Sequence, residues 1–294
     1  MTAPHPLVIA HRGARAHAPE NTLAAARLAH AAKADMWELD TCLTRDGHLV
    51  VVHDDTLERT TDVAKRPEFA NRAPWAVDVF TLEEVRSLDA GSWFREKDPF
   101  GTVASGEVSG AMLSSYIGEK IPTLAEALQL TKDLGWRVNV EIKSHAGDAG
   151  HTVVTRKVAE CIKTQGMEDA VVISSFQHAY LREMAELLPS VPRGALVEMP
   201  TPGQDPTQGR RAGTAIVASL SVKDAAAMCR TADAAFFHPD KAFLSADFVA
   251  AMQGLGFPIN VWTVNMPEDL RRMIEFGTHG IITDYPARLR AMLK

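Results

Sequence analysis

Apolar residues follow two periods along most of the chain. Short apolar runs of about four to eight residues, typical of buried strands, alternate with longer segments in which apolar residues recur at helical spacing. The first run is Leu7–His11, and an Ala-rich helix follows it to about residue 33. The pattern predicts nine strands, at residues 7–11, 36–42, 49–53, 138–142, 170–174, 193–197, 234–238, 259–264 and 280–283.

A turn signal separates the second predicted strand from the third. Asp46 and Gly47 lie between them, and this pair favours a tight hairpin turn. We therefore expect residues 49–53 to run antiparallel to residues 36–42. The other eight strands are mostly followed by helices, a pattern typical of the (β/α)8 or TIM barrel of the α/β class. A nucleotide-binding doubly wound sheet is less favoured, because no strand is followed by a Gly-x-Gly-x-x-Gly or Walker-type loop.

The alternation breaks at residues 54–121, after the second barrel strand. This stretch contains a helical pattern at 81–88 and a turn-rich, Gly- and Ser-rich sequence at 89–115. We interpret it as a segment inserted on one face of the barrel, as a small subdomain or a lid. An amphipathic helix at 123–134 resumes the pattern. The whole chain, residues 1–294, is expected to be a single TIM-barrel catalytic domain.

The composition excludes several classes of protein. Hydrophobic residues make up 46% of the 294 residues and charged residues 23%, as in an ordinary globular chain with ample core. The net charge is −6 and no block of Lys and Arg occurs, so a nucleic-acid partner is not expected. No apolar run approaches the ~20 residues that span a bilayer, so stable membrane insertion is not expected either.

Two further features bear on location. The N-terminal sequence enters its first strand almost at once, which leaves no room for a signal peptide. The three cysteines, Cys42, Cys161 and Cys229, are far apart and odd in number, so they are interpreted as core thiols in a reducing compartment. We therefore expect a cytoplasmic protein.

Polar side chains stand at the ends of the predicted strands. Glu38 and Asp40 are two residues apart, so their side chains share one face of a strand. The hairpin turn folds His53 back into the same layer, and the first strand ends in His11 and Arg12. The alternative is a hairpin whose charged residues simply face solvent.

The strand at 138–142 supplies a second pair of charged residues, Glu141 and Lys143. In a TIM barrel the carboxyl ends of the strands build the active site, so three carboxylates, two imidazoles and two cations would meet in one cup. Buried charge is costly unless it is paired or binds a metal. Three carboxylates suit Mg²⁺ or Ca²⁺, whereas zinc would more often recruit the histidines. An ion-pair network without a metal is the alternative.

The remaining groups suit a phosphate ester. Arg12 and Lys143 would hold an anion that bridges to the metal, and phosphate is the obvious candidate. Of His11 and His53, one can remove a proton while the other donates one, although a lone histidine is more often a core residue. Together these groups indicate phosphodiester cleavage.

The chain resembles the glycerophosphodiester phosphodiesterase family in eight motifs that occur in the family's order. They are HRG (11–13), PENT (19–22), ELD (38–40), TRDGHLVVVHDDTLERTT (44–61), GEKIPTLAEAL (118–128), NVEIK (139–143), VWTVN (261–265) and GIITDYP (280–286). The resemblance implies a TIM barrel with an insertion after the second barrel strand. It also implies hydrolysis of a glycerophosphodiester to sn-glycerol 3-phosphate and an alcohol.

The resemblance further implies three groups of site residues: a general acid/base pair, three divalent-metal ligands and two phosphate contacts. In that order they are His11 and His53; Glu38, Asp40 and Glu141; and Arg12 and Lys143. The expected first step is attack by the substrate's own glycerol 2-hydroxyl on phosphorus. It gives a cyclic phosphate that water then opens.

Other residues are assigned less directly. Phe176 and Trp262 are candidates for lining the substrate pocket, with core packing as the alternative for both. Glu20 is expected at the entry to a helix, near enough to Arg12 in sequence to orient it. Asp284 is expected to serve a turn before a proline two residues later.

The segment at 95–117 is longer than the family's usual bridge, so we expect it to overhang the site and to affect head-group choice. Two alternatives to the proposed reaction remain open: phospholipase D-like action on lysophospholipids, and a barrel that binds phosphodiesters without cleaving them. The sequence leaves the head group, the physiological metal and the oligomeric state open.

Overall fold

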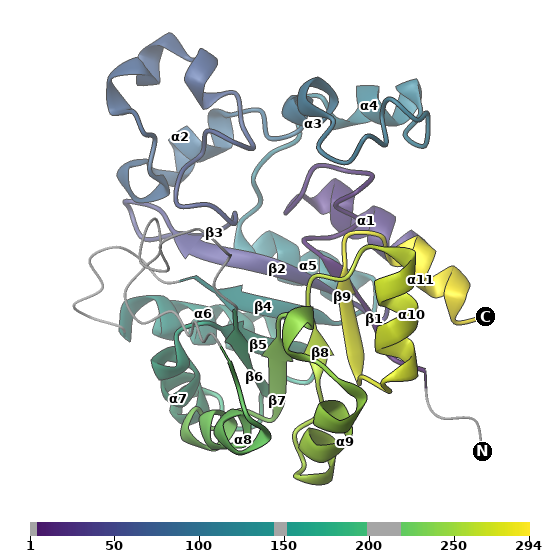
Figure 1. The fold of residues 1–294 in the computed structure, drawn as a ribbon. Coiled ribbons are helices and arrows are strands. Elements are labelled where there is room, and N and C mark those ends of the chain that lie inside the picture. Colours follow the sequence, from purple (N-terminus) through teal and green to yellow (C-terminus); the bar gives the residue numbers. More distant parts are fainter. Residues whose placement is uncertain (1–4, 144–151, 199–218) are drawn as a thin grey trace.

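Eight parallel strands form the centre of the molecule in the computed structural model, which describes residues 5–143, 152–198 and 219–294 (Figure 1). Their hydrogen-bonded order is β7-β6-β5-β4-β2-β1-β9-β8, and single bridges, Phe237 to Ile259 and Asp240 to Trp262, join the two outermost strands. The strands are β1 (Leu7–His11), β2 (Met36–Leu43), β4 (Val138–Ile142), β5 (Val171–Ser175), β6 (Arg193–Val197), β7 (Phe236–Pro239), β8 (Asn260–Val261) and β9 (Gly280–Thr283). The expected TIM barrel is confirmed.

Each barrel strand leads to a helix, and the helices surround the strands (Figure 1). The helices are α1 (Leu23–Ala31), α5 (Leu124–Asp133), α6 (Thr152–Gln165), α7 (His178–Leu187), α8 (Val222–Thr231), α9 (Ala246–Gly254), α10 (Pro267–Glu275) and α11 (Pro286–Met292). Side-chain caps mark the starts of α1, α5, α8 and α9, whereas α10 and α11 begin with a proline and have no side-chain cap. Thr22 caps α1, and Thr123 forms a capping box with Glu126 at the start of α5.

The hairpin after β2 is also confirmed. The short strand β3 (Leu49–Val51) pairs antiparallel to β2, with Thr41 opposite Val51. Gly47 in the turn has φ +77°, a conformation that glycine adopts without steric cost. The backbone N–H of Val52 then donates to the carbonyl of Asp40 at 3.1 Å, which brings the chain after β3 back to the end of β2.

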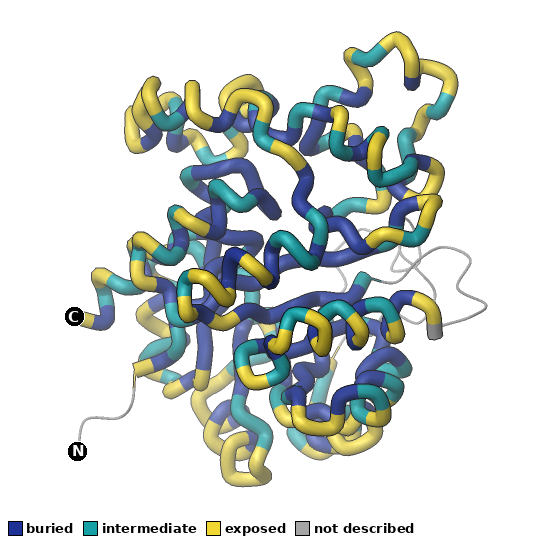
Figure 2. The backbone as a smooth tube through the Cα atoms, turned by 180° about the vertical axis from the view of Figure 1, so that it is seen from behind, coloured by how far each residue is buried: buried dark blue, intermediate teal, exposed yellow. Residues whose placement is uncertain are grey.

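The barrel interior is apolar at one level and polar at the next. Side chains two residues apart on a strand point to the same side, so Ile9 shares a face with His11, and Met36 shares one with Glu38. The apolar members form a cluster of their own: Ile9, Met36, Val172 and Ile282. The strands are therefore buried on both faces, whereas the surrounding helices expose their outer faces (Figure 2).

The first part of the inserted segment packs against the hairpin. It contains three 3₁₀ turns and the expected helix α2 (Leu82–Ser87), with the turns at Val63–Lys65, Pro67–Arg72 and Val77–Val79. Their buried side chains, among them Phe80, share a cluster with Val50 and Val52 beside β3. The hydrophobic core of this part therefore includes residues of the hairpin.

The second part of the inserted segment packs against α1. Its helices, α3 (Ser92–Lys97) and α4 (Gly110–Tyr116), lie in the stretch where the sequence predicted turns. They have six and seven residues, too few for a helical period to be visible. Phe94 and Tyr116 share a cluster with Ala18 and Ala25. The single-domain organisation stays a prediction. Among the described residues, no helix combines the length and apolar character needed to cross a membrane.

Candidate active site

A cavity of about 550 Å³ opens where the barrel strands end. Eight of the nine expected site residues line it: His11, Arg12, Glu38, His53, Glu141, Lys143, Phe176 and Trp262. The ninth, Asp40, is 1% exposed and is bonded to residues of the wall. The barrel thus brings together residues that are spread over most of the sequence.

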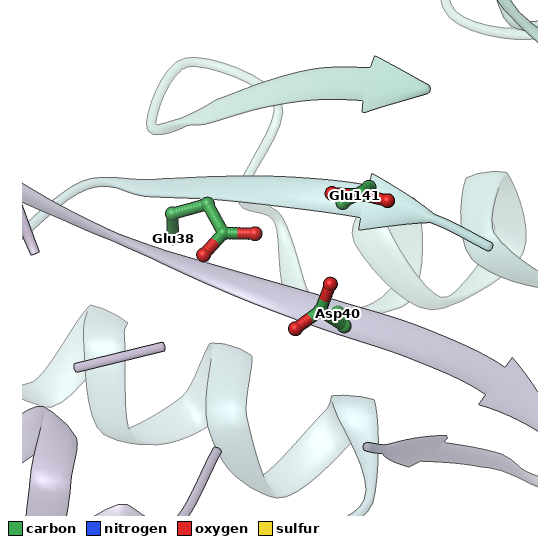
Figure 3. Close-up of side chains that lie close together, drawn as sticks. All are labelled: Glu38, Asp40 and Glu141. Carbon is green, nitrogen blue, oxygen red and sulfur yellow. The ribbon is translucent and has the colours of Figure 1, made fainter. Parts of the chain in front are cut away.

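Three buried carboxylates form the base of one side of this cavity. Glu38 and Asp40 come from β2 and Glu141 from β4, and the three side chains face the same space between these neighbouring strands (Figure 3). Each offers a carboxylate oxygen within 4.8 Å of the others. The register places Asp40 opposite Glu141, which explains why the carboxylates meet.

Two cations compensate this cluster only in part. Lys143 Nζ lies 2.7 Å from Glu141 Oε1 and 3.1 Å from Asp40 Oδ1, and Arg12 Nε lies 3.2 Å from Asp40 Oδ2. Burial opposes ionisation of Asp40, but Lys143 and Arg12 outweigh it and hold the pKa of Asp40 well below its usual range. For Glu38, burial and the charges of Asp40 and Glu141 raise the pKa well above its usual range. With all three carboxylates ionised, the cluster would carry more negative charge than Lys143 and Arg12 balance, and burial together with this repulsion is what raises the pKa of Glu38.

The donor set fits a hard divalent cation. Mg²⁺ and Ca²⁺ take oxygen ligands, and all three groups here are carboxylates. Glu38 receives the backbone N–H of Arg12 at 3.0 Å. Ion pairs with Arg12 and Lys143 compensate the charges of Asp40 and Glu141, but neither cation forms an ion pair with Glu38. A candidate metal site is thus present.

His11 is held by a carboxylate from the far end of the sequence. Its Nδ1 lies 2.7 Å from Asp284 Oδ1, and Asn265 Nδ2 donates to Asp284 Oδ2 at 2.6 Å. The expectation of a turn role for Asp284 is wrong, since Asp284 is 2% exposed and faces His11. Burial opposes its ionisation, but the neighbouring His11 lowers the pKa of Asp284 to about 2.

His53 has a similar partner next to it in sequence. Its Nδ1 lies 2.7 Å from Asp54 Oδ1, and Arg59 Nε donates to Asp54 Oδ2 at 2.5 Å. Burial opposes ionisation, but the bonds to His53 and Arg59 hold the pKa of Asp54 below its usual range. Neither Asp54 nor Arg59 was singled out from the sequence, although the motif TRDGHLVVVHDDTLERTT contains both.

Burial favours the neutral form of both histidines. Burial and Arg12 lower the pKa of His11. Burial, Arg12 and Lys143 lower the pKa of His53 to about 3. An ionised carboxylate can only accept, so each Nδ1 carries the proton and each Nε2 is left as the acceptor of a neutral ring.

The loop between β1 and α1 supplies further buried groups. Arg12 and Asn21 have φ of 54° and 58°, a strained left-handed conformation for residues with a side chain. Asn21 Nδ2 donates to Asp40 Oδ2 at 2.8 Å, and Arg12 Nη1 donates to Glu20 Oε1 at 2.8 Å. The expected contact between Glu20 and Arg12 is confirmed. Gly13 allows α1 to approach, since a Cβ there would lie 2.6 Å from the backbone of Ala25.

Another part of the cavity lining is aromatic. Phe176 and Trp262 meet edge to face, with ring centroids 5.5 Å apart. Trp262 Nε1 donates to the carbonyl of His238 at 2.8 Å, which fixes the indole. Asn139 was overlooked: it lines the cavity two residues before Glu141, and its Oδ1 has no hydrogen-bond partner within the described part of the chain.

The expected overhang of residues 95–117 is not seen in the cavity lining, and the expected effect of this segment on head-group choice stays a prediction. No residue of this segment lines the cavity, whose contribution from the insertion is Asp54, Asp55 and Thr56. The segment packs instead on α1 and on the loop before it, because its apolar residues find their partners there. Tyr116 OH, for example, donates to the carbonyl of His17 at 3.0 Å.

Comparison with known proteins identifies the family. A model described as the glycerophosphoryl diester phosphodiesterase family matches residues 11–288. A glycerophosphodiester phosphodiesterase of Caldanaerobacter subterraneus subsp. tengcongensis is 35% identical over 283 residues, 96% of each chain. A crystal structure from Silicibacter pomeroyi has a TM-score of 0.77 at 28% identity, covering 99% of this chain and 94% of that one. A phosphodiesterase from Oleispira antarctica, in complex with the product sn-glycerol-3-phosphate, has a TM-score of 0.75 at 26% identity and covers 98% and 97%. The chain therefore belongs to the glycerophosphoryl diester phosphodiesterase family and is an enzyme.

Proposed function

We propose that the protein hydrolyses glycerophosphodiesters to sn-glycerol 3-phosphate and an alcohol, with a divalent metal ion. One observation carries this proposal: two histidines, each backed by an ionised carboxylate, share a cavity with a cluster of three buried carboxylates. The product complex of the Oleispira antarctica protein supports the glycerol phosphate half of the substrate. A cytoplasmic location, expected from the cysteines, remains part of this proposal.

The metal ligands in this proposal are Glu38, Asp40 and Glu141. Mg²⁺ and Ca²⁺ both suit an all-oxygen donor set, and the partly uncompensated charge of the cluster favours a cation there. A bound ion would supply positive charge beside the phosphate oxygens. Arg12 and Lys143 are proposed to contact the phosphate from the same wall of the cavity.

The two histidines divide the proton transfers. One takes the proton of the glycerol 2-hydroxyl through its Nε2, as that oxygen attacks phosphorus. The other enters the step as an imidazolium, protonated on both nitrogens, and donates its Nε2 proton to the oxygen of the leaving alcohol as the bond of that oxygen to phosphorus breaks. The product of this step is a cyclic phosphate. Water opens it with the two roles exchanged, which restores both rings to their starting protonation.

Phe176 and Trp262 are proposed to contact the substrate where their rings line the cavity. Their perpendicular rings form an apolar corner, against which the alcohol half of the diester can rest. No residue at 95–117 lines the cavity, so nothing there extends this corner into a long groove for an acyl chain. This favours glycerophosphodiesters over lysophospholipids.

The first experiment measures release of glycerol 3-phosphate from glycerophosphocholine with Mg²⁺ or Ca²⁺, and then with EDTA. We expect release that EDTA abolishes and that is lost in His11→Ala and His53→Ala. His48→Ala, which changes a half-exposed hairpin histidine, is the matched control and should keep full activity.

Other outcomes point to the alternatives. If a folded wild-type protein releases nothing with either ion, the proposal is wrong and lysophospholipids become the next substrates to test. Binding of a glycerophosphodiester without turnover of either substrate class would indicate the non-catalytic barrel. A substrate analogue without the 2-hydroxyl should be inert, and normal turnover of that analogue would instead indicate direct attack by water.

A further inference from the structure

Glu20 lies between the two histidine–aspartate pairs, outside the cavity lining. Its side chain is 2% exposed and accepts four hydrogen bonds from three arginines. Oε1 accepts from Arg12 Nη1 at 2.8 Å and from Arg59 Nη2 at 2.7 Å. Oε2 accepts from Arg15 Nε and Arg59 Nη1, both at 2.8 Å. These four bonds fill the acceptor capacity of a carboxylate.

Two of these arginines continue to the carboxylates behind the histidines. Arg59 also holds Asp54, with its Nε at 2.5 Å from Oδ2 and its Nη2 at 2.9 Å from Oδ1, and Asp54 holds His53. Arg15 reaches Asp284 through Nη1 at 3.5 Å, and Asp284 holds His11. An unbroken chain of polar contacts therefore joins the two rings through Glu20.

The two arms of this chain differ in strength. The Arg59 arm makes two short bonds to Asp54. The Arg15 arm makes one long bond, and Asp284 has a second anchor in Asn265 at 2.6 Å. His53 therefore depends on Glu20 more than His11 does.

The charge of Glu20 is what keeps the arginines in place. Burial opposes its ionisation, but Arg12, Arg59 and Arg15 outweigh it and hold the pKa of Glu20 well below its usual range. Without that charge three guanidinium groups would repel one another in a buried site, where like charges interact strongly. Arg15 and Arg59 would then move, and the carboxylates behind the histidines would lose their support.

We propose that Glu20 is a positioning residue for both catalytic histidines, acting through Arg59 on His53 and through Arg15 on His11. This inference rests on the proposed acid/base roles of the two histidines. It makes Glu20 the point at which the two proton-transfer groups are held in mutual alignment. A merely structural Glu20 would stabilise the loop before α1 without acting on either proton transfer.

The test compares two substrates that differ in their need for a general acid. Choline leaves glycerophosphocholine as an alkoxide that must be protonated, whereas p-nitrophenol leaves the corresponding p-nitrophenyl ester without help. The variants are Glu20→Gln, Arg59→Met and Arg15→Met. Glu107→Gln is the control, because it removes a half-exposed ion pair with His17, on the loop that contains Glu20, and keeps an amide oxygen that can accept from Ser105.

We expect Glu20→Gln to lower kcat on glycerophosphocholine by about 10²-fold, within the range of a general acid–base contribution, and to change KM much less. Its loss should be smaller on the p-nitrophenyl ester. One of the two arginines supports the histidine that acts as the general acid. The variant of that arginine should regain kcat on the p-nitrophenyl ester, and the variant of the other arginine should not. Arg59→Met should have the larger effect on glycerophosphocholine.

Two results would overturn the inference. One is a Glu20→Gln enzyme as active as the wild type on both substrates. The other is an equal loss on both substrates in all three variants, which a general weakening of the structure would cause. If Glu20→Gln does not fold, the kinetics of the two arginine variants on the two substrates still test the inference. A wild-type enzyme inert on both substrates would instead refute the proposed function.

Discussion

Each histidine of the site is fixed by a carboxylate on its Nδ1. Asp284 and Asp54 lie at the same distance, 2.7 Å, from His11 and His53. Because the carboxylates are ionised, they select the tautomer whose Nε2 is an acceptor. The orientation of both rings thus depends on residues that do not react themselves.

Asp284→Asn tests this dependence. An amide at this position can donate to Nδ1 and so stabilises the wrong tautomer of His11. We expect kcat to fall by up to the ~10²–10⁴-fold that general acid–base catalysis contributes, with little change in KM. Steady-state kinetics on glycerophosphocholine measures this. Asp233→Asn, at a carboxylate whose side chain is 68% exposed, is the control, and an Asp284→Asn enzyme with unchanged kcat would contradict the role.

Some of the residues predicted from the sequence are neighbours along the chain, whereas the others were predicted from their places at strand ends and in motifs. Glu38 and Asp40 are two residues apart on one strand, so their common face follows from strand geometry. His11 and Asp284 are separated by 273 positions, and no local pattern relates them. Asp284 also precedes a proline by two residues, which made a turn the simpler interpretation.

At the scale of elements, α3 and α4 brace the loop that precedes α1. Thr102 Oγ1 donates to the carbonyl of Ala16 at 2.6 Å, and Tyr116 OH donates to that of His17 at 3.0 Å. The guanidinium of Arg15 lies 5.3 Å from the ring centroid of Phe100. This second part of the inserted segment thus supports the groups behind the histidines without lining the cavity.

Replacing Phe100 tests this support. Phe100→Leu removes the aromatic face beneath Arg15, a contact worth about 0.5–1 kcal/mol at such sites. We expect kcat to fall a few-fold, and the ratio of kcat/KM for glycerophosphocholine to that for glycerophosphoethanolamine to stay constant. Ile117→Ala, at a side chain 60% exposed, is the control. A changed ratio would mean that the segment selects the head group after all.

The sequence predicted α2 and α5 but not α3 and α4. The capping box of Thr123 and Glu126 predicts the start of α5, and the ten residues of this helix are enough for its apolar positions to show a helical period. In α3 and α4 the positions of the apolar side chains are instead set by contacts with α1, whose residues lie about 70 to 90 positions away in the chain. Tertiary contacts therefore decide these two helices.

At the scale of the whole molecule, the barrel interior contains a histidine that is not part of the cavity. His238 is 1% exposed, and its Nε2 lies 2.9 Å from Asn260 Nδ2. Burial lowers the pKa of His238 to about 3, from an ordinary value of 6.5. Between these values the unfolded chain binds a proton that the folded chain does not, so stability falls as the pH falls.

His238→Gln should remove part of this pH dependence. The wild type is expected to lose about 2 kcal/mol of unfolding free energy between pH 7 and pH 5 through this residue, and the variant should lack that loss. Urea unfolding at the two pH values measures it. Exposed His48→Gln serves as the control, and equal pH dependence in wild type and His238→Gln would contradict the prediction.

A bound cation should also stabilise the whole fold. Above the dissociation constant, each tenfold increase in Mg²⁺ or Ca²⁺ adds about 1.4 kcal/mol to the unfolding free energy. Glu38→Gln should abolish this response, yet the metal-free variant should be no less stable than the wild type, because the change relieves repulsion among three buried carboxylates. Thermal unfolding with and without the ions measures both effects. An undiminished response in Glu38→Gln would remove Glu38 from the ligands.

The barrel itself was predictable because the sequence pattern that indicates it extends over the whole chain. Eight apolar runs with helices between them survive errors of a residue or two at each end, and the strands lie within such errors except β8, which ends three residues before the predicted end. The closing contact between β7 and β8 is different. It consists of single bridges at Phe237 and Asp240, which no pattern in the sequence indicates.

The position of β1 has a consequence for biosynthesis. It pairs with β2 on one side and with β9 on the other, and β9 leads directly to Asp284. A ribosome makes β1 first among the barrel strands and β9 last. The pairing of β1 with β9 therefore cannot form until translation has nearly finished. A nascent chain that already contains His11, His53 and the three carboxylates still lacks the group that orients His11. We therefore expect prematurely terminated products to lack activity, so that activity would mark a barrel that has been made through to its last strand.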